Sequence, residues 1–215
     1  MAKAKTEPAK ATSATTGIAR LAPAQTRSRE RFEKILACAE ELLVEKGGDT
    51  LRMSDIVERA DVPFGSLYQY FPDKTAIIGT LAERYNAIGR ECVGKELKAM
   101  RGADDLHPAL CRITDGFFRM YQKEPIMSAL WEATLADRRL QALDREDCEY
   151  LAGLLGEALQ PFADDADQGE IGSFAGLIMA LIGAAVRHAI TLDEPEANRV
   201  LAQFKAMLPD LPAPG

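Results

Sequence analysis

The sequence lacks close cysteine pairs and long uninterrupted hydrophobic runs. Its four cysteines lie singly at wide intervals, unlike those of a zinc site or a dense disulfide framework, so we expect reduced, mostly buried residues. The longest apolar run, from Phe174 to Val186, ends at Arg187, whereas a membrane-spanning helix needs about 18 apolar residues or more. The first residues also lack the apolar central region of a secretory signal. The sequence therefore predicts a cytoplasmic protein with no membrane partner.

Motifs of the common enzyme classes are missing as well, since neither a glycine-rich phosphate loop nor an activated-nucleophile motif is present. Two local groups keep an enzyme as an alternative. His107 and Cys111, four residues apart, form a candidate metal pair. The second group is an acidic cluster of Asp144, Glu146, Asp147 and Glu149. A histidine at a helix start and a solvated acidic face explain these residues better, so we expect no enzyme activity, no metal and no cofactor.

No segment alternates β-branched residues over the length of a strand, and apolar residues recur at three- and four-residue spacing along most of the chain. The predicted fold class is therefore all-α. Residues 1–26, rich in Ala, Thr and Pro, predict a flexible basic arm. Helices are expected at about 28–46, 54–60, 64–70, 74–100, 109–123, 126–137, 140–162, 168–191 and 195–207.

Individual residues predict where the first helices begin and end. Gly47 and Gly48 supply a stop for the first helix. Ser54 is a candidate N-cap of the second helix, because its hydroxyl can accept a hydrogen bond from a free amide of the first turn. Asp61 is expected to end that helix. Together these signals predict two short helices joined by a tight turn.

The net charge of −7 is divided unevenly along the chain. Residues 1–74 hold 12 basic and 11 acidic residues, for a net charge of +1, whereas residues 75–215 hold 14 and 22, for −8. The acidity therefore belongs to the C-terminal part. The basic excess is greatest in residues 1–31, which can meet phosphate. A solvated, flexible tail is the alternative interpretation for most of residues 1–19.

The segment from Leu51 to Lys74 has the pattern of a helix-turn-helix. Apolar positions fall where its two short helices must pack on each other and on the first helix: Ile56, Ala60, Val62 and Leu67. Polar and aromatic residues alternate around the exposed side: Ser66, Tyr68, Gln69 and Tyr70. Such a unit can present its second helix, the recognition helix, to the major groove of DNA.

The run Gly65-Ser-Leu-Tyr-Gln-Tyr-Phe-Pro-Asp-Lys74 resembles the recognition-helix signature of the TetR family, and the likeness covers residues 27–77. It implies a three-helix helix-turn-helix DNA-binding domain at 27–74. It also implies a C-terminal helical domain for ligand binding and dimerisation at 75–215. The protein is then expected to be a sequence-specific transcriptional regulator.

Three positions depart from the common pattern of that family. Val57 stands where Ala is usual, Asp61 where Gly is usual, and Pro63 where Ser or Thr caps the recognition helix. Asp tolerates the left-handed backbone conformation that Gly would supply, and Pro is accepted in the first turn of a helix. We therefore expect the fold to be kept, with changes in affinity or docking angle.

Carried over position by position, the resemblance implies DNA contacts from the motif and from the basic segment before it. The candidate residues are Arg27, Arg52, Ser54, Phe64, Gly65, Ser66, Tyr68, Gln69, Tyr70 and Lys74. Gln69 can pair with adenine, Phe64 can touch a thymine methyl and Tyr68 can bond a phosphate. Lys74 at a helix start can hold a phosphate. For Phe64 and Tyr70, packing in the core is the alternative.

One recognition helix reads only a few base pairs of double-stranded DNA, so we expect a homodimer on a palindromic operator. The segment 168–191 is apolar nearly all round, which suits a helix covered on both faces. With 195–207 it would form the four-helix interface that the resemblance implies. The alternative is a helix buried wholly within one subunit.

Aromatic and methionine residues gather on the predicted helices 109–123 and 126–137, where the resemblance implies an inducer pocket. The candidate ligand contacts are Phe117, Tyr121, Met127 and Trp131. An unidentified small effector, largely apolar, would then release a repressor from DNA. Two alternatives stay open: these residues form ordinary core, or the protein regulates transcription without a small-molecule effector.

Overall fold

The computed structural model describes residues 26–162 and 168–209, and every regular element in these ranges is helical. The prediction of a flexible arm over 1–26 lies outside the described residues, except for Thr26, which begins the first helix. The α-helices are α1 (Thr26–Thr50), α2 (Met53–Ala60), α3 (Phe64–Tyr70), α4 (Lys74–Lys98), α5 (Leu106–Lys123), α6 (Ile126–Ala136), α7 (Arg138–Leu159), α8 (Gln168–Ala189) and α9 (Glu194–Met207). Short 3-10 helices lie at Ala103–Asp105 and Gln160–Phe162.

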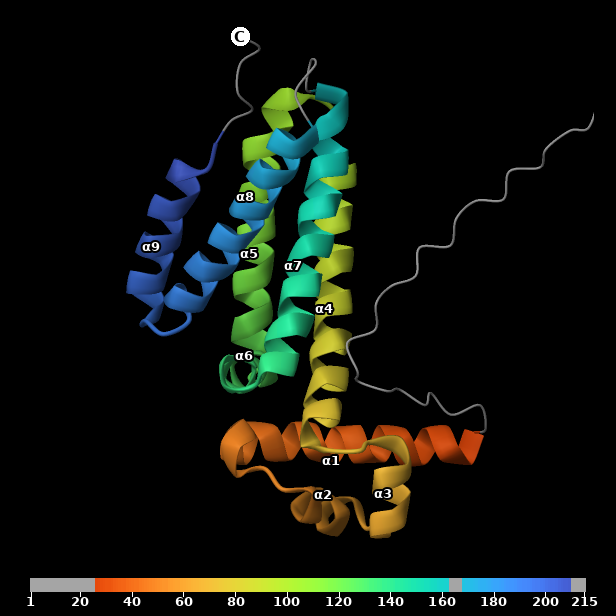
Figure 1. Ribbon diagram of the computed structural model, residues 1–215. Helices are drawn as coiled ribbons and strands as arrows, with labels where there is room; N and C mark the ends of the chain where they lie inside the picture. The colour runs from red at the N-terminus through yellow and green to blue at the C-terminus, as the bar shows by residue number, and fades with distance from the viewer. Residues whose placement is uncertain (1–25, 163–167, 210–215) are drawn as a thin grey trace, which may run out of the picture.

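The helices form two parts that α4 connects. α1, α2 and α3 make a small N-terminal module at one end of the molecule, and α4 runs from this module into a bundle with α5, α7 and α8 (Figure 1). α1 lies across the end of the bundle, with α2 and α3 on its far side. α6 packs on α1, and α9 packs on α8 at the outside of the bundle.

One apolar core continues from the module into the bundle. Buried residues of α1 to α4 cluster with residues of α6 and of the start of α7, among them Ile126, Leu130 and Leu140. The approach of α1 to α6 is close, because a Cβ added to Gly48 would lie 2.8 Å from the Cβ of Ala133. A displacement of α6 therefore acts directly on the packing of the module.

The helix ends agree in part with the sequence signals. Asp61 ends α2 in the left-handed conformation, with φ 49° and ψ 55°, as expected of an Asp in place of Gly. The N-cap prediction was wrong: Arg52 occupies that position, and Ser54 lies inside the first turn. The predicted stop at Gly47 agrees with a break in the helical conformation there, with φ 76° and ψ 163°, and a short helical segment continues beyond this kink to Thr50.

α8 is long and apolar enough to cross a membrane by length and composition alone, with a mean hydropathy of 1.7 for Gly169–Ala189. In the bundle it packs on α5, α7 and α9 through buried residues such as Ile178 and Ile182. Its opposite face leaves Leu177 and Leu181 exposed. α8 is thus a bundle helix with one uncovered apolar face.

Candidate DNA-binding surface and ligand pocket

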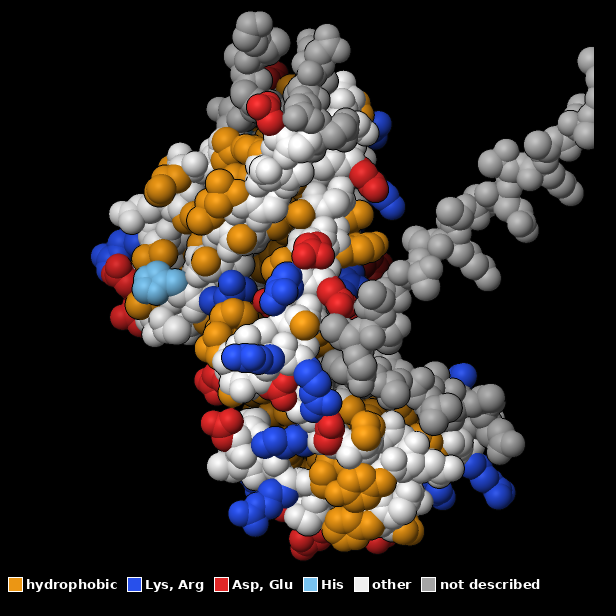
Figure 2. Space-filling view, viewed as in Figure 1, with side chains coloured by type: hydrophobic (Ala, Val, Ile, Leu, Met, Phe, Trp, Pro, Cys, Tyr) orange, Lys and Arg blue, Asp and Glu red, His pale blue; other side chains and the backbone are white. Residues whose placement is uncertain are grey.

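α3 presents an aromatic surface at the end of the molecule farthest from the bundle. Phe64 and Tyr68, one helical turn apart, are 52% and 50% exposed, and their rings stack with centroids 6.5 Å apart. Gly65 and Gln69 are also exposed, and Ser66 is half-buried. Figure 2 shows hydrophobic side chains gathered here over α2 and α3. Large exposed aromatics on so short a helix are typical of a binding surface.

The structure places two of the predicted DNA contacts elsewhere. Tyr70 is buried, with its hydroxyl 2.6 Å from the Oγ of Ser28 and its ring edge-on to Phe32. The ammonium of Lys74 donates to the backbone carbonyl oxygens of Gly48 and Asp49, at 2.8 Å and 3.2 Å. Tyr70 therefore packs in the module instead of facing outward, and Lys74 ties α4 to the end of α1 instead of presenting a free cation.

The other predicted contacts outside α3 are exposed. Arg27 lies in the first turn of α1, while Arg52 and Ser54 lie at the start of α2. The nearby acid Asp55 is paired with Lys46 at 2.9 Å, and this hydrogen bond lowers the pKa of the Asp55 carboxyl. Because Lys46 neutralises the Asp55 carboxylate, this acid repels a DNA phosphate near the start of α2 less strongly.

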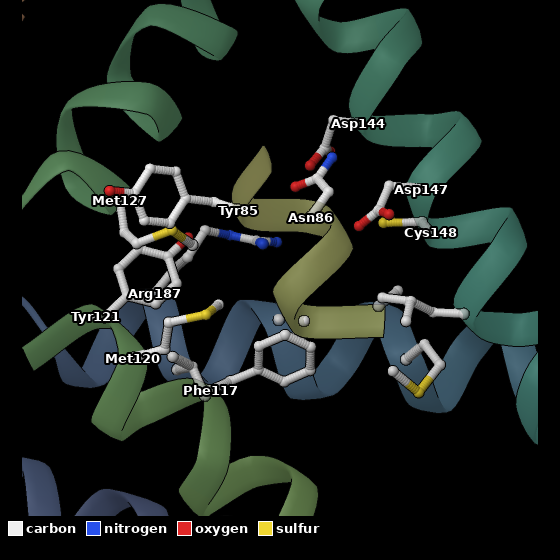
Figure 3. A pocket seen from close by; sticks show the side chains of 16 residues that line it. Tyr85, Asn86, Phe117, Met120, Tyr121, Met127, Asp144, Asp147, Cys148 and Arg187 are labelled. Carbon is white, nitrogen blue, oxygen red and sulfur yellow. The ribbon is translucent and has the colours of Figure 1, made fainter. Parts of the chain in front are cut away.

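A pocket of about 90 Å³ lies within the bundle, between α4, α5, α6, α7 and α8 (Figure 3). Its lining combines apolar, aromatic and charged side chains. The lining residues are Tyr85, Asn86, Gly89, Phe117, Met120, Tyr121, Met127, Asp144, Asp147, Cys148, Leu151, Met179, Ala180, Gly183, Val186 and Arg187. Every helix from α4 to α8 contributes, so the contents of the pocket affect the packing of the whole bundle.

Three of the four predicted ligand contacts, Phe117, Tyr121 and Met127, line this pocket. Trp131 does not: it lines an adjoining cavity of about 50 Å³, which Tyr121 and Met127 also border. The guanidinium of Arg187 lies over its ring, 4.0 Å from the centroid. Trp131 therefore lies next to the pocket and contacts Arg187, which lines the pocket.

The sequence suggested that the acidic cluster of α7 forms a solvated face, but only part of the cluster is solvated. Glu146 and Glu149 are exposed, but Asp144 and Asp147 are half-buried and line the pocket. Burial raises the pKa of both buried carboxyls, and the Arg90 guanidinium, 2.5 Å from Asp147, opposes this rise at Asp147. The three-residue spacing of Asp144 and Asp147 puts them on one helical face, which was the available signal.

The thiol of Cys148, also in the pocket, is held in its protonated form near neutral pH. Burial, together with the carboxylates of Asp144 and Asp147, raises the pKa of this thiol to about 11. A thiolate is the nucleophilic form of cysteine, so the environment disfavours reaction with electrophiles. Cys148 contributes to the pocket as a small apolar group.

Residues 104–211 match the family described as "Tetracyclin repressor-like, C-terminal domain", which covers half of the chain, and residues 35–81 match "Bacterial regulatory proteins, tetR family". The chain belongs to the TetR family of transcriptional regulators. The two matched regions correspond to the helix-turn-helix module and to the helical C-terminal domain. The all-α fold class and the resemblance to the TetR family are confirmed.

Curated relatives of this TetR-family protein match over part of its length. The HTH-type transcriptional regulator YvdT of Bacillus subtilis, described as uncharacterized, is 44% identical over 61 residues, 28% of this chain and 30% of the relative. The repressor KstR of Rhodococcus jostii is 30% identical over 101 residues, 46% of this chain and 45% of the relative. The chain thus matches less than half the length of these relatives.

Solved TetR-family structures extend the likeness to most of the fold. A TetR-family regulator from Streptomyces coelicolor is 27% identical with a TM-score of 0.58, covering 84% of this chain and 96% of that one. FadR of Bacillus subtilis, solved with stearoyl-CoA, is 19% identical with a TM-score of 0.62, covering 83% and 100%. The second likeness is one of fold.

TetR-family proteins are regulators, and the candidate metal pair of this member has a structural place. Pro108 is accepted in the first turn of α5, so the helix begins at Leu106 and includes His107. The Nε2 of His107 lies 2.9 Å from the backbone carbonyl oxygen of Lys205, and Cys111 lies 3.8 Å from Nδ1. His107 therefore joins α5 to α9.

Two sets of polar contacts connect the bundle of this TetR-family protein to its module. Tyr85, a pocket residue of α4, donates its hydroxyl to Oε1 of Glu40 on α1 at 2.7 Å. At the start of α4, Thr75 donates to Oδ2 of Asp137, the N-cap of α7, also at 2.7 Å. Sequence reasoning missed Tyr85, because its partner lies 45 residues away in the sequence.

Proposed function

We propose that the protein is a homodimeric repressor that binds a palindromic operator through α3 and leaves it when a small molecule enters the bundle pocket. The exposed surface of α3, formed by Phe64, Gly65, Tyr68 and Gln69, carries this proposal. Two half-exposed aromatic rings on one short helix indicate a binding surface, and the major groove of DNA accepts such a helix. Residues 27–74 then act as the DNA-binding domain, and residues 75–215 as the effector and dimerisation domain.

In this proposal the residues of α3 divide the work of recognition. Gln69 pairs with an adenine edge, Phe64 contacts a thymine methyl, and Tyr68 donates to a phosphate. Gly65 and Ser66 let the backbone approach closely, while Arg27, Arg52 and Ser54 contact the sugar-phosphate backbone around the site. Tyr70 and Lys74 support the geometry of the module and make no direct contact.

The dimer is proposed to form through the uncovered faces of α8 and α9. On α8, Leu177 and Leu181 are 58% and 43% exposed, with small residues such as Ala180 and Ala184 exposed beside them. Figure 2 shows hydrophobic side chains spread over this face of the bundle. A two-fold pair would bury these residues and would set the spacing of the two recognition helices at about one turn of DNA.

Release by a ligand is supported by the pocket, by small molecules bound to proteins of similar fold and by a relative named as a repressor. FadR was solved with stearoyl-CoA and SmeT with triclosan, and KstR is named as a repressor. The cavity of about 90 Å³ is smaller than the roughly 300–1,000 Å³ of drug-sized sites, so a ligand must displace helices to enter. Such a ligand prefers the displaced arrangement and weakens DNA binding by the same factor.

The test is an electrophoretic mobility shift on DNA from upstream of the gene, with operators selected from random duplexes as a second source. We expect a salt-sensitive, sequence-specific shift that Gln69→Ala and Tyr68→Ala each weaken by about tenfold or more, since a good base pairing contributes about 1–3 kcal/mol. Tyr150→Ala is the control, because Tyr150 is an equally exposed tyrosine on α7. Specific binding unaffected by both α3 variants would refute the proposal.

A further inference from the structure

The ligand pocket contains a carboxylate that lacks a partner within the described part of the chain. Asp147 forms an ion pair with Arg90, which in turn pairs with Glu83. Asp144, one turn earlier on the same helix, forms neither an ion pair nor a hydrogen bond with another described side chain or backbone group. The two acids of the lining therefore differ: one is neutralised by the protein, and the other faces the cavity without a cation in contact.

Burial raises the pKa of Asp144 and the positive charge of Arg187 opposes this rise, but the Arg187 guanidinium contacts Trp131. Its guanidinium lies 4.0 Å from the centroid of the Trp131 ring, a cation–π geometry. Gly183 makes room for this position, because a Cβ there would lie 2.9 Å from Nη1 of Arg187. Figure 3 shows the side chains of Arg187 and Asp144 entering the pocket from separate helices. Arg187 is thus held at the indole and beside the Tyr121 hydroxyl, and it acts on Asp144 through its charge without forming an ion pair with it.

The rest of the lining suits the apolar body of a cation. Phe117 and Tyr121 supply aromatic faces, which attract positive charge, and Met120 and Met127 supply polarisable thioethers that adapt to irregular shapes. Of the two carboxylates in the lining, Asp147 is already neutralised by Arg90, so Asp144 is the one available to a cationic group. Burial raises the pKa of Asp144, and a cation in contact would offset the cost of that desolvated charge.

We propose that the pocket binds an amphipathic organic cation, whose ammonium or amidinium group contacts Asp144 and whose apolar body packs on Phe117 and the two methionines. The inference rests on the proposed ligand-responsive function and names the ligand class for that site. Flexible Met120 and Met127 are the side chains that move to enlarge the cavity. Arg187 contributes by excluding a second positive charge near Trp131, which fixes the orientation of the cation.

Three probes of the same shape and different charge test the ligand class: 4-phenylbutylamine, 4-phenylbutanol and 4-phenylbutyrate. Binding is measured by isothermal titration calorimetry on the full-length protein without DNA. We expect the amine to bind about tenfold more tightly than the alcohol, the equivalent of one hydrogen bond to a charged group, and the butyrate to bind least. Asp144→Asn removes the preference for the amine, and Asp144→Glu, which keeps the charge, retains it.

Glu146→Gln is the matched control, because Glu146 is an exposed acid on the same helix outside the pocket. It keeps the preference for the amine. Equal affinity for amine and alcohol, no binding of the amine, or an unchanged preference in Asp144→Asn would each overturn the proposal, and tighter binding of the butyrate would assign the anchor to Arg187 instead. Operator binding of the same variants without probe is measured separately, so a failed regulator and a wrong ligand class give different results.

Discussion

The position of the Arg187 guanidinium depends on the absence of a side chain at Gly183. A cation over an indole contributes about 0.5–2 kcal/mol, according to how well it is shielded from water. A methyl group at residue 183 would lie 2.9 Å from Nη1, which is closer than normal contacts allow. Since Nη1 is the far end of a flexible side chain, the guanidinium would move away and the helix would stay intact.

We therefore predict that Gly183→Ala changes the fluorescence of Trp131, the only tryptophan of the chain, while the lost cation–π contact offsets the gain of up to about 1 kcal/mol from helix propensity. Gly176→Ala is the matched control, because it lies on the same helix and nothing is within 4 Å of its added Cβ. It is expected to gain up to about 1 kcal/mol of stability, with an unchanged emission spectrum. Identical spectra in both variants would contradict the placement of Arg187.

Single residues were predictable where the cause is local. The left-handed conformation of Asp61 follows from its own side chain and its place after α2. Tyr70, for which core packing was the stated alternative, and Lys74 could not be placed from the sequence, because their partners Ser28 and Gly48 lie 42 and 26 residues earlier. In the recognition-helix signature these residues stand beside exposed ones, and only tertiary packing turns them inward.

At the level of helices, α4 is shared by the pocket and the module. Its residue Tyr85 lines the pocket with its ring and donates its hydroxyl to Glu40 on α1. Burial and the hydrogen bond to Glu40 both raise the pKa of Tyr85, so the hydroxyl remains a donor at physiological pH. A ligand that displaces the ring strains this hydrogen bond and thereby acts on the orientation of α1.

Tyr85→Phe keeps the ring and removes the hydroxyl, so it separates these two roles. We predict that it lowers the free energy of unfolding by about 1–2 kcal/mol, measured by urea denaturation, because a hydrogen bond to a carboxylate is lost. We also predict that operator affinity responds less to an effector. Tyr150→Phe, whose hydroxyl bonds no described residue, is the control and leaves both quantities unchanged. An equal response to effector in Tyr85→Phe would show that another contact carries the coupling.

The existence of the helices followed from apolar spacing, but their ends depended on neighbours. α1 is interrupted at Gly47, the predicted stop, and a short further segment leads to Thr50, within which a Cβ at Gly48 would lie 2.8 Å from the Cβ of Ala133. The family resemblance implied a pocket on α5 and α6, where aromatic and methionine residues gather, and ordinary core was the alternative. The charged side of the pocket, from α7 and α8, could not be predicted, because Asp144 and Arg187 look like surface residues until the bundle brings them together.

For the whole molecule, the uneven distribution of charge between the N-terminal and C-terminal parts matches the roles proposed for them. The N-terminal part, with a net charge of +1, carries the surface proposed for DNA, and the part with −8 carries the pocket proposed for a cation. α3 has seven residues, too few to specify an operator alone. Useful specificity therefore requires that two modules be held at a fixed spacing, which makes the assembly of the dimer part of DNA recognition.

We predict that Leu177→Glu combined with Leu181→Glu converts the dimer to a monomer and lowers operator affinity by at least about a hundredfold. Each change places a charge at the centre of the proposed interface, where burying an unpaired carboxylate costs several kcal/mol. Light scattering after size-exclusion chromatography measures the mass, and fluorescence anisotropy measures operator binding. The control is Leu135→Glu, an equally exposed leucine on α6. If the double variant remained a dimer by mass while Leu135→Glu became a monomer, the dimer interface would lie on α6. The apolar face of α8 would then bind a different partner.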